Sequence, residues 1–146
     1  MGNMLQVRAD ARPEYIRPLR DAVANLASET GMSGVQVYAV KLCVGEAIAN
    51  SVKHAYPESE PGLVDVSAQE LGDELVVTVA DHGRRRGTFR THTEDEGGFG
   101  LAFISRLTDH CTFVAAHDGT TVEMLFPLRT VKAPIPSRSR LAVRVE

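Results

Sequence analysis

Three polar residues able to do chemistry, Glu46, Asn50 and His54, recur every four positions in an otherwise apolar stretch. In an α-helix, residues four apart lie on the same side, about one turn from each other, so these three would form a polar stripe. A carboxylate can act as a general base, and an amide oxygen suits a hard cation such as magnesium. Taken alone, the segment fits either a solvated helix face or one wall of a binding site.

Two later segments favour the binding site. The sequence Asp81-His82-Gly83 follows an alternating apolar run, where a carboxylate can accept a hydrogen bond from an exocyclic amine and Gly83 lets the backbone pass close to a flat ligand. The sequence Gly97-Gly98-Phe99-Gly100 opens a predicted helix, whose free N–H groups and positive dipole end suit phosphates. Each motif is weak alone, but the three in this order point to a nucleotide site.

Apolar periodicity predicts the elements that must position these residues. Ser33 and Gln36 form a possible capping box at the start of the helix that carries Glu46 and Asn50. Helices are predicted at 13–30, 33–55 and 98–109, and strands at 4–8, 64–69, 75–79, 111–116 and 121–128, with a long polar loop at 82–97. This order predicts an α/β two-layer sandwich with a mixed, mostly antiparallel sheet and the helices on one face.

Length and charge narrow the class of protein. The 146 residues suit a single domain, predicted over 1–129, and residues 130–146 are interpreted as a basic, proline-containing tail that is flexible or loosely docked. The net charge of −3 combines this basic tail with an acidic body, which argues against nucleic-acid binding. No apolar run approaches the roughly 20 residues of a membrane span, and the N-terminus lacks a signal-peptide pattern. We interpret Cys43 and Cys111 as buried free thiols and expect a cytoplasmic protein.

The motifs together resemble a known family. They read GEAIANSVKHAY at 45–56, VADHG at 79–83, EGGFGLAFISRLTD at 96–109 and DGTTVEM at 118–124. With them the sequence resembles the GHKL ATPases (the histidine kinase-like, Bergerat-fold superfamily). It is most similar to the small anti-sigma factor serine/threonine protein kinases, because no sensor or dimerisation helices accompany the domain.

The resemblance implies that the chain binds ATP and Mg²⁺. Asn50 would ligate the magnesium, Glu46 would be the general base, Asp81 would read the adenine amine and Gly83 would make room beside the base. The other nucleotide-side positions are Lys53, His54, Gly98, Phe99, Gly100, Leu101 and Thr121. Lys53 also fits a solvated lysine, and His54 fits a structural histidine at the helix end. Segment 84–97 would be the ATP lid, and Arg85 departs from the pattern because the family often has glycine there.

By resemblance alone, the chain is expected to sequester a sigma factor and to phosphorylate a STAS-domain anti-anti-sigma protein, working as a homodimer without nucleic acid or membrane. An alternative function is a module that binds ATP as a conformational ligand with little phosphotransfer. Glu46 favours the enzyme, because a pure binder has no need of a base there. A scaffolding domain without nucleotide would require the three motifs to be coincidental.

Overall fold

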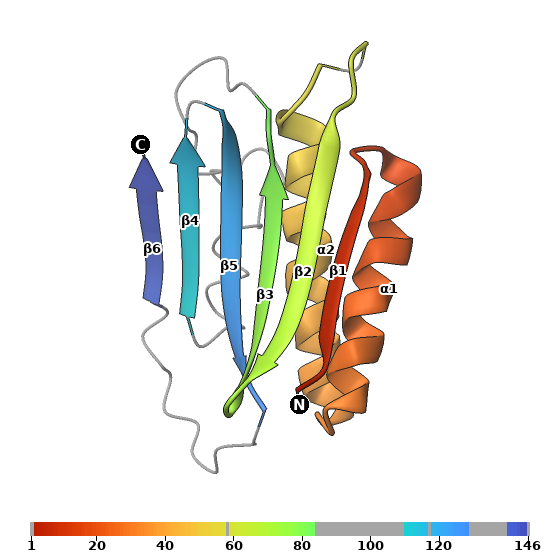
Figure 1. Ribbon diagram of the computed structural model, residues 1–146, viewed down its shortest axis with the longest axis vertical. Helices are drawn as coiled ribbons and strands as arrows, with labels where there is room; N and C mark the ends of the chain where they lie inside the picture. Colours follow the sequence, from red (N-terminus) through yellow and green to blue (C-terminus); the bar gives the residue numbers. More distant parts are fainter. Residues whose placement is uncertain (1, 58, 84–109, 117, 129–139, 146) are drawn as a thin grey trace.

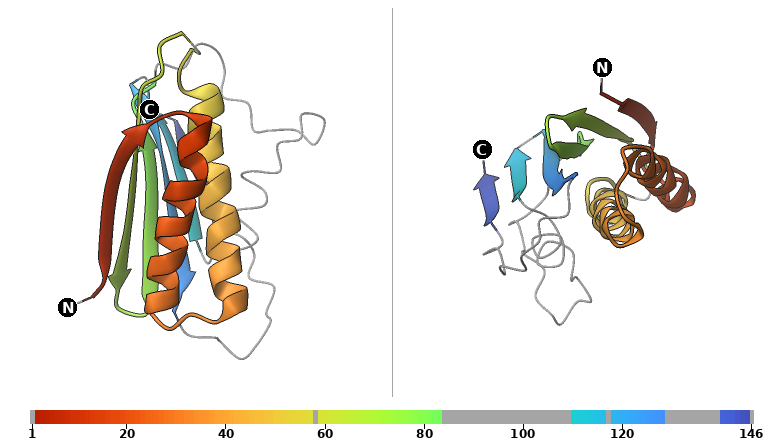
Figure 2. Two further views of the ribbon diagram at one scale, coloured as in Figure 1. Left: turned by 90° about the vertical axis from the view of Figure 1, so that its right-hand side faces the viewer. Right: turned by 90° about the horizontal axis from the view of Figure 1, so that it is seen from below.

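A computed structural model of the chain describes residues 2–57, 59–83, 110–116, 118–128 and 140–145. These residues form a six-stranded sheet of order β1-β2-β3-β5-β4-β6, with two helices packed on one face (Figures 1 and 2). All strand pairs are antiparallel except β4 and β6, which are parallel. The predicted α/β two-layer sandwich is therefore confirmed. The elements are β1 (Met4–Asp10), α1 (Pro13–Glu29), α2 (Gly34–His54), β2 (Leu63–Leu71), β3 (Glu74–Asp81), β4 (His110–Ala116), β5 (Gly119–Pro127) and β6 (Arg140–Val145).

The start of α2 has the predicted capping box. Ser33 Oγ accepts a hydrogen bond from the Gln36 backbone N–H at 3.2 Å, and Gln36 Oε1 accepts one from the Ser33 N–H at 2.9 Å. These two bonds satisfy backbone donors that a helix start leaves without partners. Both helices end within one residue of the predicted boundary. Neither described helix is long and apolar enough to span a bilayer.

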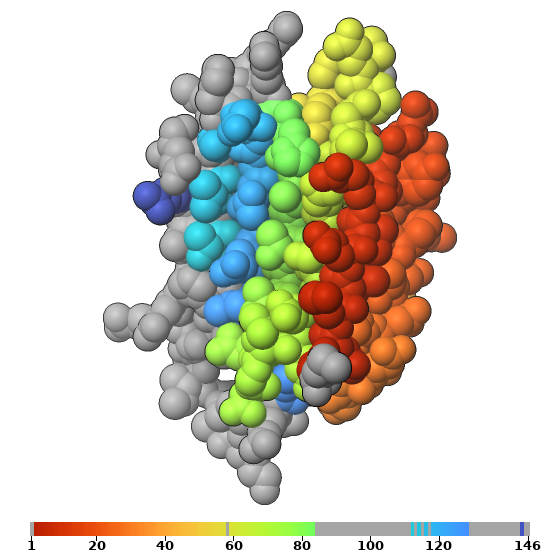
Figure 3. All heavy atoms as spheres, in the orientation of Figure 1, coloured from red at the N-terminus to blue at the C-terminus, as the bar shows by residue number. Residues whose placement is uncertain are grey.

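Side chains along β2, β3 and β5 alternate between a face buried under the helices and an open face. Figure 3 shows the open face, where no described helix covers the strands. The alternation on β3 buries Leu75, Val77 and Val79, and it continues to the last residue of the strand, Asp81. The alternation of side chains along this strand therefore directs the Asp81 carboxylate into the protein interior. The buried partners on the neighbouring strands are Val64, Val66 and Ala68 on β2 and Thr120, Val122, Met124 and Phe126 on β5.

The chain ends differently from the prediction. Residues 140–145 form β6, which pairs with β4 along its length from His110↔Arg140 to Ala115↔Val145. The interpretation of 130–146 as a flexible or loosely docked tail is therefore wrong for these six residues, which pair within the sheet. A short run interrupted by arginine and preceded by prolines carries too little pattern to predict a strand. The other predicted features of 84–109 and 130–139, including the helix at 98–109, lie outside the described residues.

The capping box is expected to contribute to the free energy of unfolding. Ser33→Ala should lower the free energy of unfolding by about 1 kcal/mol, because the Gln36 N–H loses its acceptor. Urea denaturation followed by circular dichroism would measure the change. Ser28→Ala, at an exposed site in the last turn of α1, is the matched control and should change stability by less than about 0.5 kcal/mol. Equal effects of the two substitutions would contradict a capping role.

Candidate nucleotide site

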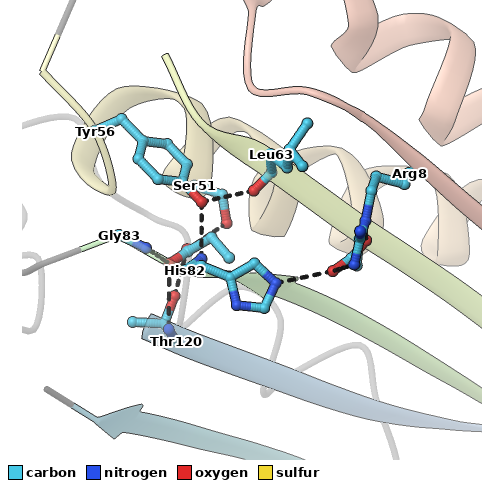
Figure 4. Close-up of polar contacts among 9 residues, drawn as sticks. Arg8, Ser51, Tyr56, Leu63, His82, Gly83 and Thr120 are labelled. Atoms are coloured by element: carbon cyan, nitrogen blue, oxygen red, sulfur yellow. Dashed lines mark hydrogen bonds and ion pairs between the residues drawn. The ribbon is translucent and has the colours of Figure 1, made fainter. Parts of the chain in front are cut away.

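The site is built around the carboxylate of Asp81, which is only 4% exposed. Its Oδ2 accepts hydrogen bonds from the hydroxyls of Ser51 at 2.8 Å and Thr120 at 2.5 Å (Figure 4). Its Oδ1 accepts from the backbone N–H groups of Gly83 and Thr120, both at 3.2 Å. A buried charge is tolerated only with such partners, and these four bonds supply them.

Three elements meet at this carboxylate. Asp81 ends β3, and the antiparallel register places it opposite Thr120 at the start of β5. Ser51 comes from the last turns of α2, which packs over this part of the sheet. The sequence predicted that Asp81 contacts a ligand but gave no sign of its two hydroxyl partners, Ser51 and Thr120, which are 30 and 39 residues away along the chain.

The predicted Thr121 and its neighbour Thr120 lie on opposite faces of the sheet. Thr121 pairs with Ala80 on the open face of the sheet, so it points away from the Asp81 carboxylate. Thr120 lies on the buried face and contacts Asp81 through both its N–H and its hydroxyl. The sequence already indicated that Thr120 faces the interior, because residues two and four positions apart on a strand lie on the same face, and Val122 and Met124 are apolar.

Two glycines allow the close packing around Asp81. A Cβ on Gly83 would lie 2.0 Å from the backbone oxygen of Ala55, at the end of α2. A Cβ on Gly119 would lie 2.1 Å from the backbone oxygen of Asp81, and the φ of Gly119, +155°, disfavours other residues. Gly83 was predicted to make room beside a base. In the structure it makes room for the end of α2, and the need for Gly119 was not predicted.

Glu46 and Asn50 lie on the flank of α2 that faces away from α1. Lys41 faces α1, where its Nζ is 3.5 Å from Oδ1 of Asp21. At 3.6 residues per turn, Asn50 is half a turn around the helix from Lys41, and Glu46 lies about 6 Å before Asn50 along the axis. Both side chains are partly buried, and no hydrogen bond or ion pair joins either to another described residue. Asn50 directly precedes Ser51, so this flank adjoins the Asp81 cluster.

The remaining predicted site residues fall into two groups. Lys53 and His54 are exposed in the last turn of α2, where positive charge suits the negative end of the helix dipole. Gly98, Phe99, Gly100 and Leu101 lie outside the described residues, as do Arg85 and the predicted lid at 84–97.

Tyr56 is a structural anchor of the site that sequence reasoning missed. Its hydroxyl donates to the backbone oxygen of Leu63 at 2.7 Å and accepts from the backbone N–H of His82 at 2.8 Å (Figure 4). Its ring fills the space beside Gly62, where a Cβ would lie 2.2 Å away. Burial raises the pKa of Tyr56, so the phenol stays protonated at neutral pH. Tyr56 thus ties the end of α2 to the start of β2 and to the residue after Asp81.

An ion cluster lies on the open face beside this anchor. Arg8 contacts Asp65 through Nε at 2.6 Å and Nη2 at 3.2 Å, and His82 Nε2 lies 3.0 Å from Asp65 Oδ2. The hydrogen bond from Arg8 is the main cause that lowers the pKa of Asp65, and His82 adds to it. This cluster joins β1 and β2 to the turn after β3.

Comparisons with known proteins agree with this fold. Residues 9–126 match the histidine kinase-like ATPase domain family. The serine-protein kinase RsbW of Bacillus subtilis is 33% identical over 133 residues, covering 82% of both chains. RsbW of Listeria innocua is 32% identical over 122 residues, covering 75% of this chain and 78% of that protein. A crystal structure of the RsbU and RsbW domains of a Mycobacterium tuberculosis protein has a TM-score of 0.69 at 20% identity, covering 86% of this chain and 32% of that one, and so supports the fold.

The fold and the family match define the class of protein: the chain belongs to the histidine kinase-like ATPase family. Its relatives within that family include the RsbW serine-protein kinases.

The role of Tyr56 can be tested by removing only its hydroxyl. Tyr56→Phe should lower the free energy of unfolding by about 1–3 kcal/mol, because the Leu63 carbonyl and the His82 N–H both lose a partner. Urea denaturation would measure the loss. Tyr38→Phe is the matched control, since Tyr38 is 62% exposed on α2, and it should leave stability unchanged. A similar stability for both variants would contradict the anchoring role.

The Asp65 cluster predicts a pH dependence. The folded protein holds the pKa of Asp65 below its ordinary value of 3.8, so the cluster stabilises the fold above that pH. This contribution is lost as the pH falls through the lowered pKa. Asp65→Asn should therefore lose less stability than the wild type on acidification from about pH 5 to pH 2. Arg8→Gln, which removes the main cause, should flatten the profile in the same way. Parallel profiles for wild type and Asp65→Asn would contradict the assignment.

Proposed function

We propose that this chain is an ATP-dependent serine/threonine protein kinase that acts as an anti-sigma factor in a partner switch. It would sequester a sigma factor and phosphorylate a STAS-domain anti-anti-sigma protein. The observation that carries the proposal is that Glu46 and Asn50 share one flank of α2, the same helix whose Ser51 holds the buried Asp81 carboxylate. The similarity to serine-protein kinases supports the reaction class.

The nucleotide side of the site would read adenine through Asp81, which accepts a hydrogen bond from the exocyclic amine. Thr121 stays a proposed nucleotide-side residue, and we add Thr120, since its hydroxyl reaches the carboxylate. The amide oxygen of Asn50 fits Mg²⁺, because it is a hard ligand with no partner among the described residues. When bound there, the ion would neutralise phosphate charge. We place Lys53, His54, Gly98, Phe99, Gly100 and Leu101 on the nucleotide side as well.

The catalytic step would be a single phosphoryl transfer. The serine or threonine hydroxyl of the substrate protein gives its proton to the Glu46 carboxylate while its oxygen bonds to the γ-phosphorus of ATP. The bond from that phosphorus to the β–γ bridging oxygen breaks, and ADP leaves. Glu46 suits this role because its carboxylate is partly buried and is not tied to another described residue.

The proposal also includes the cellular location, the oligomeric state and the partners of the kinase. We infer a cytoplasmic homodimer that contacts its protein partners directly and needs neither nucleic acid nor membrane. A module that binds ATP but transfers little phosphate is the alternative function, and Glu46 separates the two because binding alone requires no base.

Substitution of the proposed base tests the function directly. Glu46→Gln should lower phosphotransfer about 100-fold or more, because a general base contributes at least that much, while ATP affinity stays within about threefold. The measurement is label transfer from ATP, with magnesium, to purified STAS-domain proteins of the same genome. Calorimetry would give the ATP affinity of each variant.

Glu29→Gln, at an exposed site near the end of α1, is the control and should transfer phosphate like the wild type. Label transfer that survives Glu46→Gln would remove Glu46 as the base. Absence of transfer by the wild type, with ATP binding intact, would favour the non-catalytic module.

A further inference from the structure

The Asp81 carboxylate has no acceptor position left for a ligand. A carboxylate offers about four lone-pair positions on its two oxygens. The protein already supplies four donors: the Ser51 hydroxyl, the Gly83 N–H, and the hydroxyl and N–H of Thr120. An adenine amine that binds to Asp81 must therefore displace one of them.

The four donors differ in how easily they can withdraw. The two backbone N–H groups are fixed by the turn after β3 and by the start of β5. Thr120 holds the carboxylate at two points, through its N–H and its hydroxyl, and a β-branched side chain is stiff about χ1. Ser51 holds it at one point, at 2.8 Å.

Ser51 also has another place to donate. A serine inside a helix can turn its hydroxyl to the backbone carbonyl four residues earlier, which for Ser51 is that of Ala47. A carbonyl oxygen has two lone pairs, so it can accept this bond in addition to its helix hydrogen bond. Withdrawal of the Ser51 hydroxyl therefore leaves no buried donor without a partner.

We propose that Ser51 sets the nucleotide affinity of the site by competing with adenine for Asp81. In the nucleotide-free protein its hydroxyl fills the acceptor position that the exocyclic amine takes, and it turns toward the helix backbone when adenine binds. This inference rests on the proposed adenine-reading role of Asp81. Ser51 thus stabilises the empty site and lowers the affinity for ATP in the same contact.

Ser51→Ala tests the competition, because it removes the hydroxyl and frees one acceptor position. Calorimetry with magnesium should show ATP binding about 2- to 10-fold tighter than in the wild type, the value of one hydrogen bond. Inorganic tripolyphosphate, which has no base, should bind both proteins equally. The melting temperature of the nucleotide-free variant should fall, and its increase on adding ATP should exceed that of the wild type.

Ser51→Cys offers a weaker donor of similar size and should give an intermediate ATP affinity. This variant tests the same competition if the alanine variant folds poorly. Ser67→Ala, on the open face of β2, is the control and should leave ATP binding unchanged. Equal or weaker ATP binding by Ser51→Ala, with ATP still bound by the wild type, would overturn this inference and leave the proposed function intact. Failure of the wild type to bind ATP would instead refute the proposed function.

Discussion

The buried carboxylate of Asp81 constrains this end of the molecule. The alternation of β3 directs Asp81 into the interior, and leaving that carboxylate without donors there would cost several kcal/mol. The donors come from α2, from the turn after β3 and from β5, so all three must arrive together. The position of the last turns of α2 over the sheet and the register of β5 are thus tied to one side chain. The contact that stabilises the fold is also the proposed ligand contact.

The close packing around Asp81 explains residues that have no side-chain chemistry. Gly83 and Gly119 bring the end of α2 and the start of β5 against the end of β3, at distances that a Cβ would block. Tyr56 then holds this junction from the other side, through hydrogen bonds to the backbone of Leu63 and His82. Glycines in motifs that resemble ligand-binding sequences are therefore also required for close packing of the protein itself. A substitution there changes the geometry of the carboxylate even where it touches no ligand.

Local patterns were enough to predict much of the fold. The capping box at Ser33, the alternation on β2 and β3 and the class of sandwich all depend on residues close in sequence, and the structure confirms them. The sequence predicted the structure less well where contacts between residues far apart in the chain determine the position of a side chain or strand. Thr120 rather than Thr121 faces Asp81 because of the β3–β5 register, and Ser51 becomes a partner of Asp81 only through tertiary packing. Strand β6 exists through its pairing with β4, which its own short sequence does not reveal.

The two carboxylates of the proposed site are separated by their surroundings. Asp81 is nearly fully buried and its oxygens are held by four donors, so its direction is fixed before a ligand arrives. Glu46 is partly buried and is not bonded to any other described residue. A rigid, saturated carboxylate suits recognition of a base, since it exchanges one donor for another at constant charge. A carboxylate without such bonds suits proton transfer, because no donor must leave before it accepts a proton. Environment rather than residue type thus assigns recognition to Asp81 and proton transfer to Glu46 within the proposed kinase.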